Sequence, residues 1–100
     1  MEIIHAKENE FKDLIKDEYV LVDFYADWCG PCKMLGPVLE NLKDEIKIIK
    51  VNVDECEDLA REYGVMSIPS IFLIKDGQIL DSKLGFIQES ALKEWINSNK

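Results

Sequence analysis

The alternation of apolar and polar positions predicts that extended and helical segments follow one another along most of the chain. Apolar residues with strand propensity form nearly unbroken runs at Tyr19–Ala26 and Lys47–Val53. A run that is apolar on both faces is typical of a central strand covered on both sides. A shorter apolar start at Met1–His5 predicts a further strand. A single carboxylate, Asp23, interrupts the Tyr19–Ala26 run.

Between and after these strands, apolar residues recur at the spacing of one helix face, which predicts amphipathic helices. The stripes are Phe11, Leu14 and Ile15; Met34, Leu35, Val38, Leu39 and Leu42; Cys56, Leu59, Ala60 and Tyr63; and Leu92, Trp95 and Ile96. Pro37 lies inside the second stripe and should bend that helix, because proline removes one backbone hydrogen bond. Gly64 is expected to terminate the third helix.

The dipeptide Asp76-Gly77 predicts a tight hairpin that joins Ile71–Lys75 to Gln78–Leu84 as an antiparallel pair. The earlier alternation of strands and helices predicts parallel strands joined by helical crossovers. The expected fold class is therefore α/β, with a central mixed β-sheet of about five strands and four helices that cover both faces. A chain of 100 residues is expected to form one domain spanning residues 1–100.

The charge balance narrows the range of functions. The formal net charge is −8, from 12 basic and 20 acidic residues, so binding to nucleic acid or to anionic lipid is not expected. No apolar run approaches the length that spans a bilayer. The segment Met1–His5 lacks the basic region and long apolar stretch of a signal peptide. These features predict a cytoplasmic protein.

The cysteines point to redox chemistry. The chain has three, and an odd number argues against a secreted scaffold held by disulfides. The segment Cys29–Cys32 reads Cys-Gly-Pro-Cys, a pattern used for redox catalysis or for metal binding. Structural zinc usually takes four ligands, whereas only Cys56 and the distant His5 could complete this pair. Redox catalysis is therefore favoured over a metal site.

The position of the motif, at the end of a strand and the start of a helix, suits dithiol–disulfide exchange. The dipole and free N–H groups of a helix N-terminus stabilise a thiolate, so Cys29 is the expected attacking group. Cys32 lies three residues later on the same helix face, within bonding distance, and is the expected resolving thiol. Gly30 leaves the approach to the sulfur open, and Pro31 suits the first helical turn.

For several other residues the sequence allows more than one interpretation of their role. Asp23, an acid in a buried strand, is interpreted as a general base for Cys32; the alternative is a buried acid satisfied by hydrogen bonds. Lys50, on the neighbouring strand, either tunes Asp23 or is an edge or solvent-facing lysine. Cys56 is expected to be buried and structural, with regulation or dimer formation as the alternative. Trp28 is expected at the surface of the site, and Trp95 in the core.

The segment Trp28–Lys33, which follows Val22–Phe24, resembles the signature of the thioredoxin family. Further landmarks of that family cover essentially the whole chain: Val53-Asp54, Tyr63-Gly64-Val65, Ile68-Pro69, Lys75-Asp76-Gly77 and Gly85. The resemblance implies the thioredoxin fold and a protein-disulfide reductase that is recycled by a thioredoxin reductase drawing on NADPH or ferredoxin. It also implies that the only redox group is the Cys29–Cys32 disulfide, with no bound cofactor and no metal.

The resemblance implies a docking surface and partners as well. It makes the Ile68–Pro69 bond cis, although most X-Pro bonds are trans. The expected substrate-binding residues are Trp28, Gly30, Pro31, Ser67, Ile68, Pro69 and Gly85. The expected partners of this monomer are disulfide-containing clients such as peroxiredoxin or ribonucleotide reductase. Two residues depart from the family pattern: Tyr25, where Trp is frequent, and Phe86, where a smaller residue is common.

Two other functions remain open from the sequence. The same fold can serve as an oxidant or isomerase, although oxidising members of the family usually carry histidine where this chain has Pro31. The fold can also act as a rigid binding module without catalysis. A partner interaction that survives replacement of both motif cysteines would indicate this second function.

Overall fold

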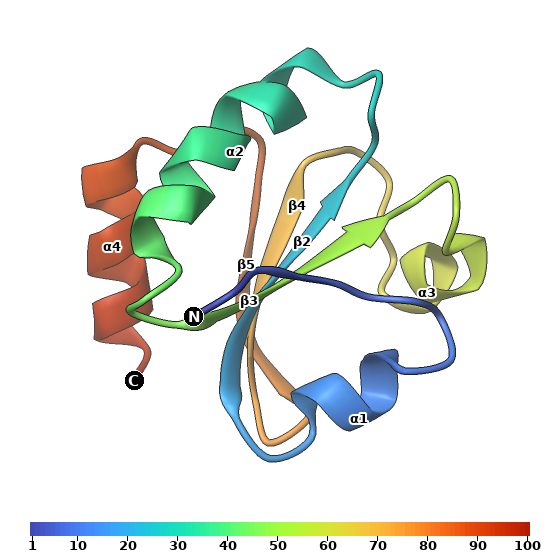
Figure 1. The fold of residues 1–100 in the computed structure, drawn as a ribbon, viewed down its shortest axis with the longest axis horizontal. Helices are drawn as coiled ribbons and strands as arrows, with labels where there is room; N and C mark the ends of the chain where they lie inside the picture. The colour runs from blue at the N-terminus through green and yellow to red at the C-terminus, as the bar shows by residue number, and fades with distance from the viewer.

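The computed structural model describes residues 1–100 as one sheet with helices on both of its faces (Figure 1). The strands are β1 (Ile4–His5), β2 (Tyr19–Tyr25), β3 (Lys47–Asn52), β4 (Ser70–Lys75) and β5 (Gln78–Leu84). The helices are α1 (Phe11–Ile15), α2 (Gly30–Leu42), α3 (Glu57–Glu62) and α4 (Glu89–Ser98). The predicted order of elements is confirmed, although the first strand is shorter than the expected Met1–His5. None of the helices combines the length and the apolar character needed to cross a membrane.

The sheet is mixed, with the strand order β1-β3-β2-β4-β5. Strands β1, β3 and β2 run parallel, while β4 is antiparallel to β2 and β5 is antiparallel to β4. Strand β2 therefore lies at the centre of the sheet, as its apolar sequence predicts. The residues of the β4–β5 turn have φ values of 51° at Asp76 and 81° at Gly77, the left-handed backbone that a two-residue hairpin requires.

Two apolar cores lie on opposite faces of the sheet. Helices α1 and α3 cover one face, where the rings of Phe11, Phe24, Tyr63 and Phe72 pack with centroids 5.5–6.5 Å apart. Helices α2 and α4 cover the other face (Figure 1), where Trp95 is only 8% exposed, as predicted. The motif cysteines lie at the junction of β2 and α2, two elements whose side chains pack in these cores.

The buried stripe of α2 differs from the prediction. Met34 was expected in this stripe, yet its side chain is 61% exposed, and Val38 is only partly buried. The buried positions are Cys32, Leu35, Leu39 and Leu42, which follow one another at spacings of three and four residues. The helix is thus rotated so that Cys32 faces inward, because a cysteine side chain is as readily buried as an aliphatic one.

Strand β5 forms one edge of the sheet and is exposed along its whole length. A register shift between Leu73 and Ile74 of β4 introduces an irregularity in the β4–β5 pairing. The strand also carries Asp81 and Lys83, and Asp81 accepts a hydrogen bond of 2.8 Å from the Trp95 indole N–H. Irregular pairing and charged side chains discourage edge-to-edge association of strands.

We expect Gly77→Ala to lower the free energy of unfolding by about 1–2 kcal/mol, because a Cβ atom is unfavourable in left-handed backbone. The φ of Gly77 is 81°, and no heavy atom outside its chain neighbours would lie within 4 Å of the added Cβ, so conformation alone causes the loss. Urea unfolding measures the effect. The neighbouring Gln78→Ala is the control and should change stability by a few tenths of a kcal/mol; equal losses for the two variants would contradict this explanation.

Candidate active site

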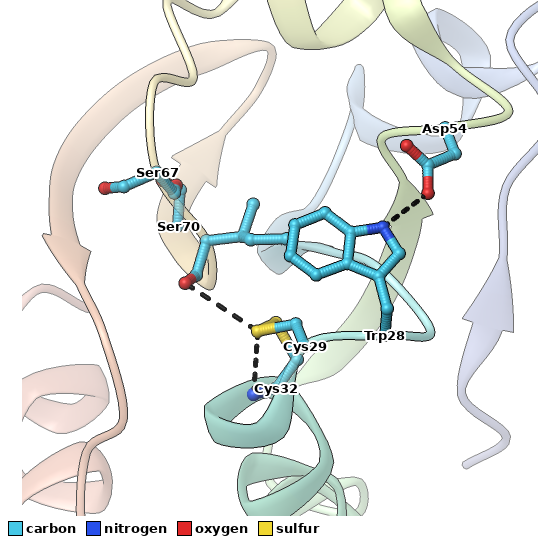
Figure 2. The surroundings of a disulfide bond; sticks show 7 residues. Trp28, Cys29, Cys32, Asp54, Ser67 and Ser70 are labelled. Atoms are coloured by element: carbon cyan, nitrogen blue, oxygen red, sulfur yellow. Dashed lines mark hydrogen bonds between the residues drawn. A yellow bond between two sulfur atoms is a disulfide. The ribbon is translucent and has the colours of Figure 1, made fainter.

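The two motif cysteines are placed by the junction between β2 and α2. Cys29 is the N-cap residue of α2, and its backbone N–H donates to the Ala26 carbonyl at 3.2 Å. Cys29 and Cys32 form a disulfide, with Cα atoms 5.2 Å apart (Figure 2). The sulfur of Cys29 accepts a hydrogen bond of 3.2 Å from the Cys32 backbone N–H. The pair therefore sits at the point of the helix that the sequence predicts.

This geometry favours negative charge on Cys29 once the disulfide is reduced. The Cys32 N–H and the positive end of the α2 dipole both stabilise a thiolate at the N-cap. The two cysteines are only 5% and 3% exposed, respectively. Burial of this kind protects the sulfurs from bulk solvent, so a substrate disulfide must approach from the loop side, where Gly30 and Pro31 are exposed.

The loop before β4 lies against Cys29. The Ile68 carbonyl oxygen is 3.8 Å from the Cys29 sulfur, and the Ile68–Pro69 peptide bond is cis, as the resemblance implied. The Ser70 hydroxyl donates to the Ser67 carbonyl at 2.6 Å, which fixes the loop around this bond (Figure 2). These contacts bring Ser67, Ile68 and Pro69 beside the disulfide, although they lie far from it in sequence.

Trp28 is anchored at the rim of the site. Its side chain is 70% exposed, in agreement with the sequence-based expectation. The indole N–H donates a hydrogen bond of 2.9 Å to a carboxylate oxygen of Asp54, which holds the ring beside the disulfide (Figure 2). Sequence reasoning did not assign this role to Asp54. The available signal was its position directly after β3, because the carboxyl ends of the parallel strands β2 and β3 lie at the same edge of the sheet.

The remaining predicted docking residue, Gly85, also reaches the site. Its backbone N–H donates to the Pro69 carbonyl at 2.8 Å, so the end of β5 joins the loop that contains the cis peptide bond. Phe86 follows it and is 38% exposed. Met66, which sequence reasoning did not select, is 96% exposed directly before Ser67. The structure thus links the predicted docking residues to one another at this end of the sheet, although Pro69 is buried and Ile68 and Gly85 are only partly exposed, and it adds the exposed Met66 next to Ser67.

Asp23 is fully buried in the centre of β2. No donor of the protein reaches either of its carboxylate oxygens, so the protein itself supplies none of the hydrogen bonds that the alternative of a satisfied buried acid requires. Burial raises the pKa of Asp23 to about 6, and the positive charge of Lys50 opposes this shift. An acid with this pKa exchanges its proton near neutral pH, which suits a general base or acid.

Lys50 lies directly opposite Asp23 in the parallel pairing of β2 with β3. Strand β3 is an inner strand, so Lys50 is not an edge lysine, but its side chain is partly exposed. Lys50 and Cys32 line the same depression of about 260 Å³, together with Tyr25 and Lys33. Asp23 therefore lies beneath a solvent-accessible depression whose walls hold both a cation and the expected resolving cysteine.

The third cysteine is separate from this site. Cys56 is only 2% exposed, and burial raises the pKa of its thiol. Its sulfur lies 3.8 Å from the Ala6 carbonyl oxygen, a contact in which the thiol donates. The predicted burial is confirmed. No group of three or more His, Cys, Asp or Glu side chains lies close enough together to hold a metal ion.

Comparison with known proteins gives consistent results. The family model described as Thioredoxin matches residues 2–98. A thioredoxin from Bacillus subtilis is 44% identical over 99% of this chain and 99% of its own length. A thioredoxin from Rickettsia felis is 47% identical, over 95% and 96% respectively. The structure of a point mutant of a thioredoxin from Halobacterium salinarum matches with a TM-score of 0.86 and 40% identity, covering 97% of this chain and 88% of that chain.

Proposed function

The chain belongs to the thioredoxin family of thiol–disulfide oxidoreductases, and we propose that it works as a protein-disulfide reductase. The observation that carries the proposal is the Cys29 sulfur at the N-cap of α2, bonded to Cys32 one turn later and bordered by the exposed residues Gly30 and Pro31. A nucleophilic sulfur with an adjacent resolving sulfur supports two-electron reduction of a bound disulfide.

The first step is attack by the Cys29 thiolate on one sulfur of the client disulfide. The client S–S bond breaks, a new bond forms between Cys29 and the client, and the other client sulfur leaves as a thiolate that takes a proton from solvent. The Cys32 N–H and the helix dipole stabilise the attacking thiolate before the step. The docking surface (Trp28, Gly30, Pro31, Ser67, Ile68, Pro69 and Gly85) presents the client.

The second step releases the reduced client. Cys32 transfers its proton to the carboxylate of Asp23, and the resulting thiolate attacks the Cys29 sulfur. The mixed disulfide breaks, the Cys29–Cys32 disulfide forms, and the client leaves as a thiolate. The client gains two electrons and the cysteine pair loses them, so the electron count balances. The buried carboxyl is suited to this transfer because its pKa of about 6 lies close to neutral pH.

The oxidised pair then needs an electron donor. We assign this task to a thioredoxin reductase that draws on NADPH or ferredoxin, with clients of the peroxiredoxin or ribonucleotide reductase type, in the cytoplasm. The family supports this assignment, since its members act on disulfide-containing substrates and hold no prosthetic group. The chain itself supplies only the redox-active disulfide.

The direct test is multiple-turnover reduction of insulin with excess dithiothreitol as electron donor. We expect the protein at substoichiometric concentration to accelerate the appearance of insulin thiols well above the rate with dithiothreitol alone. An unchanged rate would contradict the proposed function, provided that the Cys29–Cys32 disulfide itself is shown to be reduced under the same conditions.

We expect Asp23→Asn to slow resolution of the mixed disulfide more than its formation, because the amide cannot take the Cys32 proton. Rapid-quench measurement of the covalent adduct with a single-disulfide client separates the two steps. The control is Asp27→Asn, which changes an exposed carboxylate that lines the same depression as Cys32 and should leave both steps nearly unchanged. Equal slowing of the two steps by Asp23→Asn would remove the general-base role.

A further inference from the structure

Polar residues of three neighbouring strands form a row across the sheet. In the strand pairing, His5 of β1 lies opposite Lys50 of β3, and Lys50 lies opposite Asp23 of β2. Directly paired residues project from the same face of a sheet. Lys50 and Cys32 line one depression, so this is the face that α2 covers. The row runs from the exposed His5 to the fully buried Asp23.

The ammonium of Lys50 is held by an aromatic ring and not by a carboxylate. Its nitrogen lies 4.4 Å from the ring centroid of Tyr25, well within the range of a cation–π interaction. None of the ion pairs in the structure involves Lys50. Tyr25 follows Asp23 by two residues on β2, so it projects from the same face and is a diagonal neighbour of Lys50.

The Tyr25 ring also contacts His5 of β1. Its hydroxyl lies 3.5 Å from the Nδ1 atom of His5, and the two rings meet edge to face with centroids 6.4 Å apart. The Tyr25 ring thus contacts both Lys50 and His5, its neighbours on the two adjacent strands of the row. A lysine side chain has four flexible carbons, so a fixed contact of this kind restricts where its charge resides.

We propose that Tyr25 is a positioning residue for the resolving step, whose ring holds the Lys50 ammonium beside Asp23 and so sets how readily that carboxyl accepts the Cys32 proton. The inference rests on the proposed function, because it assigns a role within the transfer from Cys32 to Asp23. Tyr25 packs against the small cluster of Ala26, Cys29 and Cys32, but the role proposed for its ring acts through Lys50.

The groups around Asp23 explain why the position of this one cation matters. Strand β3 contributes Lys50, β4 contributes the apolar Ile71 as the opposite partner, and β2 contributes Tyr25. Helix α2 contributes Cys32 and the exposed Lys33, and the exposed Asp27 lies in the loop between β2 and α2. Burial raises the pKa of Asp23, and Lys50 is the charged group that lowers it. A Lys50 side chain released from the ring would spend less time near the carboxylate, and the protonated form of Asp23 would become more stable relative to the ionised form.

The test measures how the rate of mixed-disulfide resolution depends on pH. We expect Lys50→Met to move the midpoint to higher pH, and Tyr25→Leu to move it in the same direction by about half a pH unit. Tyr25→Phe and Tyr25→Trp keep an aromatic face and should leave the midpoint near the wild-type value. Adding Tyr25→Leu to Lys50→Met should cause no further shift, because the cation on which the ring acts is already gone.

A second readout avoids catalysis and tests whether the fold is intact. Carbon-13 NMR of the Asp23 carboxyl in the oxidised protein should give the same order of titration midpoints for the variants, and the spectra report whether each is folded. An equal shift by Tyr25→Leu with and without Lys50, or no shift at all, would overturn the inference. If the rate of mixed-disulfide resolution by the wild-type protein showed no midpoint with pH, the base role of Asp23 in the proposed function would be overturned instead.

Discussion

Replacing Cys29 by serine is expected to reduce turnover to the uncatalysed background, whereas Cys32→Ser is expected to accumulate covalent mixed disulfides with clients. Of the two motif cysteines, only Cys29 lies at the N-cap of α2, where the Cys32 N–H at 3.2 Å stabilises a thiolate. Without it the first bond cannot form. Without the Cys32 sulfur the first bond forms, but no internal thiol can break it. Non-reducing gels and intact-mass spectrometry detect the adduct directly.

The third cysteine supplies the matched control. Cys56 is 2% exposed and lies in the core on the α1 and α3 side, so Cys56→Ser should retain turnover per folded molecule. If Cys32→Ser sustained multiple turnovers at the wild-type rate, the two-step exchange would be wrong. If Cys56→Ser also trapped adducts, trapping would not report on the resolving role.

The second large effect is on stability: Asp23→Asn should raise the free energy of unfolding at pH 8 by about 2–3 kcal/mol. The pKa of Asp23 is about 6 in the folded protein, against a model value of 3.8. Between these values the folded state binds more protons than the unfolded state, so the contribution of Asp23 to wild-type stability is greatest below about pH 4 and is lost as the pH rises through about 6. Asparagine cannot ionise and avoids this loss.

Urea unfolding of the oxidised proteins at several pH values measures the difference. The gain from Asp23→Asn should shrink as the pH falls from 8 and nearly vanish by about pH 3, where the wild-type carboxyl is protonated in the folded state and largely so in the unfolded state. Asp27→Asn, a change at an exposed position, should show no such trend. A gain from Asp23→Asn that stays constant between pH 4 and pH 8 would mean that ionisation of Asp23 does not cause it.

The sequence predicts most of the fold because its signals are local. Unbroken apolar runs identified β2 and β3, helical spacing identified all four helices, and Asp76-Gly77 identified the hairpin. The rotation of α2 was not predicted. The expected apolar stripe included Met34 and left Cys32 out, since hydrophobic spacing alone cannot decide between two overlapping stripes on one helix. Packing against the sheet decides it, and Met34 remains 61% exposed.

The candidate site was predictable in its centre and less so in its surroundings. Cys29 and Cys32 are adjacent within one motif, so their proximity follows from sequence. Whether Lys50 lies at an edge depends on the strand order, which places β3 between β1 and β2. The contacts of Trp28 with Asp54 and of Lys50 with Tyr25 join separate segments. Such contacts arise from tertiary packing, which local patterns do not specify.

The direction of electron flow is decided by the reduction potential of the Cys29–Cys32 pair, which is measured by equilibration in buffers of defined dithiol and disulfide ratio. A protein-disulfide reductase must have a reduction potential low enough for its dithiol form to reduce client disulfides. We therefore expect the reduction potential of the pair to lie at or below the cytosolic glutathione range, that is, below about −220 mV. A clearly more oxidising value, near those of protein-disulfide oxidants at about −120 mV, would contradict this expectation and reverse the direction of electron flow.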